Sequence, residues 1–284
     1  MNIGSFGIIG GDKRQLYLAD SIRNDGHIVR LFGFDSLDDG SVDSENNLSD
    51  VISMSDALIL PLPLSRNGKD IFAPFSSKPI SIDDIAMLTD MNKPVFCGLK
   101  INSGISPLSA HNCFFYGTRE EFAAANAIPT AEGAIACAME NSDITLCGSD
   151  CLVTGYGRIG RVLSMFLRGL GATVTVSARK YRDIELIRAA GMASERIENI
   201  SGHFDFIFNT VPSLILDRKR LEAIGKDSLI IDLASLPGGV DDSAANELSV
   251  PLIHALSLPG KVAPKTAGKI IKNAVYNIIG EESL

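Results

Sequence analysis

The sequence predicts an α/β protein in which two parallel-sheet domains are joined by long linking helices. Short apolar runs alternate with amphipathic stretches along the chain, and a glycine-rich turn directly follows one of these runs. A strand, a helix and a further strand in this order are the pattern of a βαβ unit, whose strands are parallel. The length of 284 residues suits two domains. A hydrophobic content of 45% is enough to form their cores.

The first half of the chain is predicted to form a flavodoxin-like layer. A helix is expected over 13–24, because its apolar residues recur on one side and Asp25-Gly26 follow as a stop signal. The polar stretch 35–49 is rich in Asp, Ser, Asn and Gly, so it is predicted to be a loop. The strand candidates are the runs 3–9, 27–34, 57–60, 95–97 and 113–116.

A helix at the centre of the chain is expected to join the domains. It is predicted from about Thr130 to Asn141, entered through Pro129, with Glu132 in its first turn. The last segment, 263–279, has the apolar spacing of a long amphipathic helix that packs back across the junction. The predicted domains are therefore 1–128, completed by 263–284, and 129–262.

The second half alternates more regularly and is predicted to be a Rossmann-like domain. Its predicted strands are 151–154, 173–178, 206–209, 229–232 and 251–255. Its predicted helices are 158–170, 182–190, 218–224 and 242–248.

A Gly-x-Gly-x-x-Gly turn follows the first of these strands and opens the first of these helices. This context is the one that a dinucleotide-binding turn requires. Gly155 permits a tight turn, Gly157 lets a diphosphate approach the backbone, and Gly160 allows close contact between helix and strand. The alternative is that the glycines serve only as turn residues. The predicted cofactor contacts in this segment are Gly155, Tyr156, Gly157, Arg158, Ile159 and Gly160.

The end of the next strand favours NADP over NAD. An NAD-binding domain usually has an acidic residue here, about 20 residues after the turn, to bind the ribose 2′-hydroxyl. This chain has Ser177 or Ala178 at that place, followed by Arg179 and Lys180. A guanidinium can bind a 2′-phosphate through two parallel hydrogen bonds, and the lysine adds charge. The alternative is that both cations only solvate the entrance to a helix.

Three further strand ends are expected to line the same groove, because ligands of open parallel sheets bind beyond the carboxyl ends of the strands. The amide and hydroxyl after the 206–209 strand are predicted to contact the nicotinamide ribose. The residues assigned to the cofactor at these ends are Asn209, Thr210, Val211, Pro212, Leu233, Ala234, Ser235, Leu258 and Pro259.

Composition excludes several classes of function. The formal net charge is −8 and no run of basic residues occurs, so a nucleic-acid partner is not expected. The five cysteines form no C-x-x-C pair and have no histidine at ligand spacing, so no metal site is predicted. Neither a signal peptide nor a membrane-length apolar run is apparent, and a cytoplasmic protein is expected.

Taken in order, the motifs resemble those of the dipicolinate synthase A-subunit family over essentially the whole chain. The two most specific are Asp232-Leu-Ala-Ser235-x-Pro237-Gly-Gly239 and Leu258-Pro-Gly-Lys-Val-Ala-Pro-Lys-Thr-Ala-Gly268. The others are Gly10-Gly-Asp-x-Arg-Gln-Leu16, Gly33-Phe-Asp35, Ile59-Leu-Pro61, Ile128-Pro-Thr-Ala-Glu-Gly133, the Gly155–Gly160 turn and Asn209-Thr-Val-Pro-Ser213.

The resemblance implies a specific oxidation. A dihydrodipicolinate-type intermediate would be oxidised to dipicolinate (pyridine-2,6-dicarboxylate) during sporulation, with NADP as the oxidant. A flavoprotein-like partner, the B subunit of dipicolinate synthase, is also implied. Two alternatives stay open: another NAD(P)-dependent dehydrogenase of a small hydroxy or amino acid, and a protein that binds dinucleotide without turnover. Composition does not decide between a homo-oligomer and a partner interface.

A dicarboxylate substrate needs fixed cations, and Arg14 or Lys265 could supply them. Asp12 and Arg14 follow a strand, where ligands often bind, but such a pair also caps loops. Glu132 is a candidate general base, although a glutamate in a first helical turn more often pairs with the helix dipole. Thr266 belongs to the substrate side or caps the last helix.

Two further residues are weaker candidates for a role in catalysis. Lys100 lies in a predicted loop. His254 lies where hydroxyacid dehydrogenases keep a catalytic histidine, but it has no adjacent carboxylate in the local sequence, so a structural role is expected.

Overall fold

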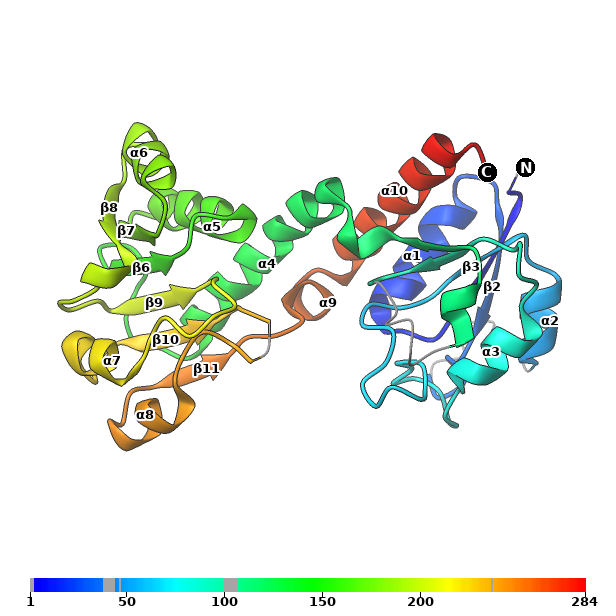
Figure 1. Cartoon of the computed structure of the whole chain (residues 1–284), viewed down its shortest axis with the longest axis horizontal. Coiled ribbons are helices and arrows are strands. Elements are labelled where there is room, and N and C mark those ends of the chain that lie inside the picture. Colours follow the sequence, from blue (N-terminus) through cyan, green and yellow to red (C-terminus); the bar gives the residue numbers. More distant parts are fainter. Residues whose placement is uncertain (1–2, 38–43, 46, 100–106, 236) are drawn as a thin grey trace. The chain divides into compact units, whose positions relative to one another are not determined.

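The computed structural model describes residues 3–37, 44–45, 47–99, 107–235 and 237–284. It divides into two compact units, of which the first comprises 1–126 with 263–284 and the second comprises 127–262. The chain therefore passes from one unit to the other twice, once within the central helix α4 and once before the last helix α10 (Figure 1).

The first unit has a flavodoxin-like sheet. Its described strands are all parallel and follow the order β2-β1-β3-β4-β5, which is the order of that fold. Every residue of β1, β3 and β4 is buried, which explains their continuous apolar sequences. The strands are β1 (Ser5–Ile9), β2 (Ile28–Phe32), β3 (Ala57–Ile59), β4 (Val95–Cys97) and β5 (Cys113–Phe115).

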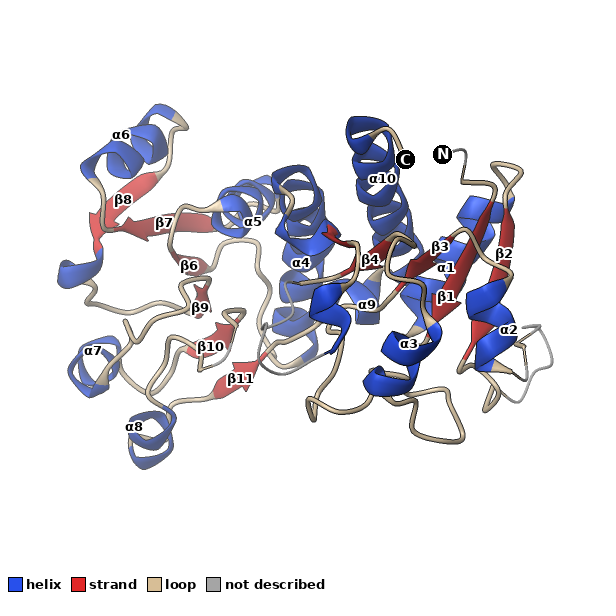
Figure 2. Cartoon of the chain, turned by 45° about the vertical axis from the view of Figure 1, so that its right-hand side comes forward, coloured by secondary structure: helices blue, strands red, loops and turns tan. Residues whose placement is uncertain are grey.

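Helices cover both faces of this sheet (Figure 2). Residues of α1 and α10 form one apolar core with β1, and residues of α2 and α3 form another on the opposite face. The helices are α1 (Lys13–Arg23), α2 (Leu48–Ser53), α3 (Ile82–Leu88) and α10 (Pro264–Glu282), with short 3-10 turns η1 (Pro107–Ala110) and η2 (Tyr116–Thr118).

Two of these helices were not predicted from the sequence. α2 begins inside the stretch 35–49 that was predicted to be a loop, and the side chain of Asn47 caps it. Ser81 caps α3 in the same way. Both helices are too short for a clear apolar period, and residues 38–43 and 46 of the predicted loop lie outside the described part of the chain.

The second unit has a Rossmann-like sheet. The order of its described strands is β11-β10-β9-β6-β7-β8, again all parallel, which corresponds to the 3-2-1-4-5-6 arrangement. The strands are β6 (Asp150–Thr154), β7 (Thr173–Ala178), β8 (Ala193–Arg196), β9 (Phe206–Asn209), β10 (Leu229–Asp232) and β11 (Leu252–His254). Together the two sheets confirm the predicted α/β class.

The helices of the second unit follow the prediction closely, but two elements were missed. The edge strand β8 is polar, and α9 is only one turn long, so neither has an apolar pattern. The elements are α5 (Arg158–Gly169), α6 (Tyr181–Ala189), η3 (Ile197–Asn199), α7 (Arg218–Ile224), α8 (Asp242–Glu247) and α9 (Leu258–Val262).

The central helix α4 begins ten residues before the predicted start. It spans Glu120–Glu140, so Pro129 lies inside it and Glu132 lies in its middle rather than in its first turn. The proline lacks an N–H and removes one hydrogen bond of the helix. The acidic residues Glu120 and Glu121 at the start and the alanines after them favour the longer helix.

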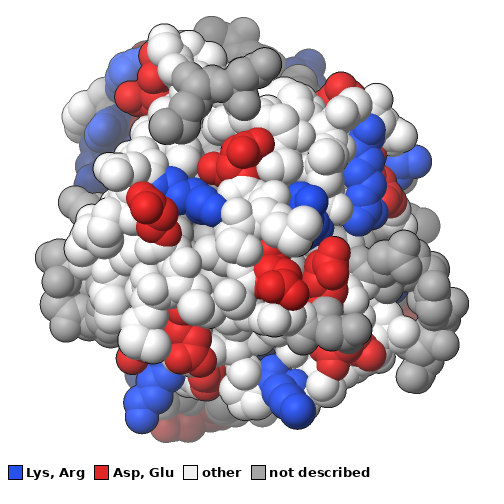
Figure 3. All heavy atoms as spheres, turned by 90° about the vertical axis from the view of Figure 1, so that its right-hand side faces the viewer, with Lys and Arg blue, Asp and Glu red and all other residues white. Residues whose placement is uncertain are grey.

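Charged residues of both signs are mixed on the surface of the first unit. On the face that Figure 3 shows, neither sign forms a continuous area among the described residues. Of the described helices, none combines the length and apolar character needed to cross a membrane.

Candidate dinucleotide-binding site

The glycine-rich turn connects β6 to α5 in the second unit. Gly155 has a φ of +87°, a conformation that glycine adopts without steric cost. A Cβ atom at Gly160 would lie 2.1 Å from the carbonyl oxygen of Gly155, whereas a Cβ at Gly157 would meet nothing within 4 Å. The turn is therefore tight on its inner side and leaves the backbone at Gly157 open to a ligand.

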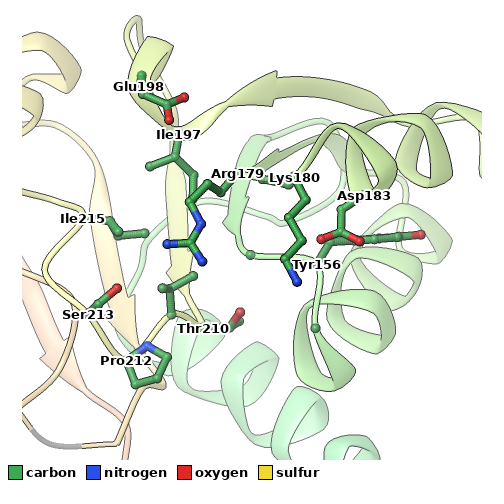
Figure 4. Close-up of a pocket in the computed structure, with 14 residues that line it drawn as sticks. Tyr156, Arg179, Lys180, Asp183, Ile197, Glu198, Thr210, Pro212, Ser213 and Ile215 are labelled. Carbon is green, nitrogen blue, oxygen red and sulfur yellow. The ribbon is translucent and has the colours of Figure 1, made fainter.

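A cavity of about 330 Å³ opens at this turn. Figure 4 shows the side chains of Arg179 and Lys180 extending from the end of β7 into the space bounded by Tyr156, Thr210 and Pro212. Its lining residues are Gly155, Tyr156, Gly157, Ala178, Arg179, Lys180, Asp183, Ile197, Glu198, Thr210, Val211, Pro212, Ser213 and Ile215.

The open backbone at a helix N-terminus, the two cations and the apolar wall fit the parts of a dinucleotide. A diphosphate suits the N-terminal end of α5, and Ile197, Val211 and Ile215 offer apolar contact to a base. Ser177, which was predicted to contact the ribose, is fully buried and does not line the cavity. The cations that follow it do.

The structure brings some of the predicted cofactor residues together and separates others. Eight line the cavity: Gly155, Tyr156, Gly157, Arg179, Lys180, Thr210, Val211 and Pro212. Ten do not: Arg158, Ile159, Gly160, Ser177, Asn209, Leu233, Ala234, Ser235, Leu258 and Pro259. Sequence reasoning did not assign six lining residues to the cofactor: Ala178, Asp183, Ile197, Glu198, Ser213 and Ile215.

Asn209 holds the turn after β9 and does not present its amide on the surface. Its side chain is fully buried; the Oδ1 atom accepts from the hydroxyl of Thr154 at 2.6 Å and the Nδ2 atom donates to Asp232 at 2.7 Å. The same amide bonds both the N–H and the carbonyl of Val211. The expected contact of this amide with a nicotinamide ribose therefore has no support in the geometry.

The predicted residues at two other strand ends differ in exposure. Leu233 and Ala234 after β10 are buried, and Ser235 is exposed. Leu258 is buried against Gly133 of α4, where a Cβ on that glycine would lie 2.8 Å from the leucine Cβ. Leu258 is thus a packing residue of α9, and Pro259 beside it is also buried.

Asp12 and Arg14 form a closed pair in the first unit. The Asp12 side chain caps α1 and accepts from Arg14 Nε and Nη2, both at 2.9 Å. Arg14 is 7% exposed and also donates to the carbonyl of Leu62 at 2.5 Å. This geometry is that of a cap and a loop tie, so much of the charge of Arg14 is already balanced.

The other predicted substrate-side residues are exposed. Lys265 and Thr266 lie in the first turn of α10, and the N-cap position of that helix is Ala263, so Thr266 does not cap it. Glu132 is exposed in the middle of α4. Lys100 lies outside the described residues.

His254 does have carboxylate neighbours, although they are distant in sequence. Its Nε2 atom lies 2.6 Å from Oδ1 of Asp242, and its Nδ1 atom lies 3.8 Å from Oδ2 of the fully buried Asp232. The parallel pairing of β10 and β11 places Asp232 opposite His254, which the sequence alone did not reveal.

Among the described residues, no group of three or more His, Cys, Asp or Glu side chains is arranged to hold a metal ion.

Comparison with protein families matches two segments of the chain. Residues 5–112 match the family of the N-terminal domain of the dipicolinate synthase A subunit. Residues 130–245 match "D-isomer specific 2-hydroxyacid dehydrogenase, NAD binding domain". The second match contains the glycine-rich turn and all the residues that line the cavity.

Individual proteins with similar sequences and structures carry one name. The chain is 31% identical to the dipicolinate synthase A subunit of Bacillus subtilis over 96% of its own length and 95% of that protein. A crystal structure of the Bacillus halodurans protein of that name has a TM-score of 0.85 at 29% identity, covering 97% of both chains. The Bacillus subtilis structure has a TM-score of 0.85 at 30% identity, covering 99% of this chain and 97% of that chain.

Proposed function

The chain belongs to the dipicolinate synthase A-subunit family, and we propose that it oxidises a dihydrodipicolinate-type intermediate to dipicolinate during sporulation, with NADP as the electron acceptor. Membership of this family and the dehydrogenase-type NAD-binding domain support an oxidoreductase that uses a nicotinamide dinucleotide. The observation that carries the choice of NADP is the pair Arg179 and Lys180 in the cavity beside the glycine-rich turn.

The residues of the cavity would bind and orient the cofactor. The open backbone of the turn and the start of α5 suit the diphosphate. Arg179 suits a 2′-phosphate, because a guanidinium binds two phosphate oxygens at once, and Lys180 adds a second positive charge. Bound NADP supplies a site that accepts a hydride, while one proton leaves the substrate ring to solvent or a base. Because the product ring is aromatic, the protein mainly has to position the ring and exclude water.

The substrate carboxylates need cations, and Lys265 is better suited than Arg14. The guanidinium of Arg14 is already bound by both oxygens of Asp12, whereas Lys265 is exposed at the start of α10. We therefore propose Lys265 as the carboxylate-binding cation and Asp12–Arg14 as a pair that shapes the loop after β1. The B subunit of dipicolinate synthase is proposed as the partner, on the basis of the family name.

The choice of cofactor is tested by titrating the protein with NADP and with NAD. Arg179→Asp removes the guanidinium and places a carboxylate beside the 2′-phosphate, so NADP binding should weaken about 100-fold, while NAD binding should change little. Isothermal titration calorimetry measures both affinities.

The matched control is Arg182→Asp, which makes the same change of charge three residues along the chain, outside the cavity lining. This control should keep the preference for NADP. Equal affinities for NADP and NAD in the wild-type protein, or an unchanged preference in Arg179→Asp, would remove the argument for NADP.

A further inference from the structure

The cavity contains two carboxylates in a place proposed to bind a phosphate. Asp183 and Glu198 line it together with Arg179 and Lys180. A carboxylate close to a phosphate is repelled, so each acidic residue requires a separate explanation. Figure 4 shows that they lie apart: Asp183 is beside Lys180, and Glu198 is beside Ile197, on the side of Arg179 that faces Ile215.

Asp183 has a structural explanation in its own helix. It lies in the first turn of α6, where a negative charge is stabilised by the positive end of the helix dipole. Glu198 has no such explanation, because it lies in the short turn η3 after β8.

The carboxylate of Glu198 is held in place by an arginine. Arg196 at the end of β8 donates from Nε to Oε2 at 2.9 Å and from Nη2 to Oε1 at 3.0 Å. The guanidinium of Arg196 lies 4.7 Å from the centre of the Tyr181 ring, which restrains it from the other side. The hydrogen bonds from Arg196 hold the pKa of Glu198 below its usual value, so this side chain is ionised at neutral pH.

An ionised carboxylate held in this way accepts hydrogen bonds and donates none. It has about four lone-pair directions, of which Arg196 uses two. A ligand group that donates hydrogen bonds is therefore favoured beside Glu198, and a ligand group that only accepts them is repelled.

The apolar side chains next to Glu198 suit a flat base. Ile197, Val211 and Ile215 line this part of the cavity, at the carboxyl ends of β8 and β9 where the adenosine half of a dinucleotide binds in this fold. A purine held between such side chains presents its edge to the polar groups around it, and Glu198 directly follows Ile197.

We propose that Glu198 is a specificity-determining residue for the base of the dinucleotide, and that its carboxylate accepts a hydrogen bond from the exocyclic amino group of adenine. Arg196 is a positioning residue for this contact. The inference rests on the proposed binding of NADP in this cavity and adds the recognition of the base, which is independent of the 2′-phosphate.

The test compares NADP with nicotinamide hypoxanthine dinucleotide phosphate, in which a carbonyl oxygen replaces the amino group. A carbonyl facing the carboxylate loses the hydrogen bond and adds repulsion, so the wild-type protein should bind the analogue about tenfold more weakly. This comparison requires no variant. It is measured by calorimetric titration of the intact protein with each dinucleotide.

Glu198→Gln should reduce the difference between the two dinucleotides to about twofold or less, because an amide can either accept from adenine or donate to hypoxanthine. Asp183→Asn changes the other carboxylate of the cavity in the same way and should retain the full difference.

The two proposals fail in different ways. Equal binding of NADP and the hypoxanthine analogue by the wild-type protein overturns the role of Glu198, as does a difference that persists in Glu198→Gln. If NADP binds no better than NAD while both bind better than their hypoxanthine analogues, the role of Glu198 stands and the proposed cofactor choice fails. Failure of the wild-type protein to bind any of these dinucleotides overturns both.

Discussion

Side chains at the carboxyl ends of the second sheet form a polar row across all its described strands. Strand pairing aligns His254, Asp232, Asn209, Thr154, Ser177 and Glu195. The central members are joined by hydrogen bonds, and the backbone N–H groups of Ala234 and Gly239 also donate to Asp232. Buried polar groups are stable when they are paired in this way. The row therefore fixes the turns that follow β9 and β10.

The other end of the row is not satisfied. Within the described chain, Ser177 Oγ and Glu195 Oε1 are buried and have no hydrogen-bond partner. Burial raises the pKa of Glu195 to about 7. The folded protein thus binds a proton here more tightly than the unfolded chain does, and the cost of ionising Glu195 appears as the pH rises from about 4.5 to above 7.

Glu195→Gln should therefore raise the melting temperature at pH 8 and change it little at pH 5. The amide has no charge to bury, and at the lower pH the wild-type carboxyl is already mostly neutral in the folded state. Differential scanning calorimetry of both proteins at both pH values measures the effect. A variant that is less stable at pH 8, or shifted equally at both pH values, would contradict the assignment of a strained carboxylate.

Two helices of the first unit approach each other closely at one glycine. A Cβ atom at Gly268 of α10 would lie 2.6 Å from the carbonyl oxygen of Arg14 and 2.8 Å from the backbone nitrogen of Leu18, both in α1. Backbone atoms cannot move aside as a flexible side chain can. Contact at this position therefore depends on the absence of a side chain.

Gly268→Ala should destabilise the protein by about 1–3 kcal/mol, because the added methyl group forces α10 away from α1. Gly280→Ala is the matched control in the same helix, where a Cβ would meet nothing within 4 Å. The control should be neutral or stabilising by up to about 1 kcal/mol, since alanine is the better helix former. Urea unfolding monitored by circular dichroism gives both values. Equal effects of the two substitutions would contradict the close packing of α1 and α10.

Elements with a strong apolar pattern could be predicted from the sequence, and short polar elements could not. The buried strand β6 and the helix α5 were located together with the turn between them, because apolar period and glycine spacing agree there. The start of α4 was misplaced because Pro129 is typical of a first turn, although a long helix tolerates it at the loss of one hydrogen bond.

The candidate site could be predicted only where it follows recognised elements. Arg179 and Lys180 come after the clear strand β7, so their place beside the turn followed from the order of the chain. Ile197 and Glu198 follow the polar strand β8, which has no apolar alternation in its sequence. Pairing with β7 brings them to the cavity, and pairing is a property of the folded sheet.

The chain as a whole places its two ends in one unit. The last helix, α10, packs on α1, and its apolar residues belong to the core that contains β1 and β2. The cavity beside the glycine-rich turn is formed entirely by residues of the second unit. Cofactor recognition is therefore a property of the second unit, while Lys265, the proposed substrate cation, belongs to the first.

The most direct test of the central claim is the oxidation itself. The protein is incubated with enzymatically generated dihydrodipicolinate and either NADP or NAD, with and without the partner protein, and the absorbance of the reduced nicotinamide is followed together with the formation of dipicolinate. The account predicts that reduced NADP and dipicolinate appear in equal amounts and faster than with NAD. Reduction of NAD at the same rate as NADP, or no reduction of either dinucleotide with or without the partner, would contradict it.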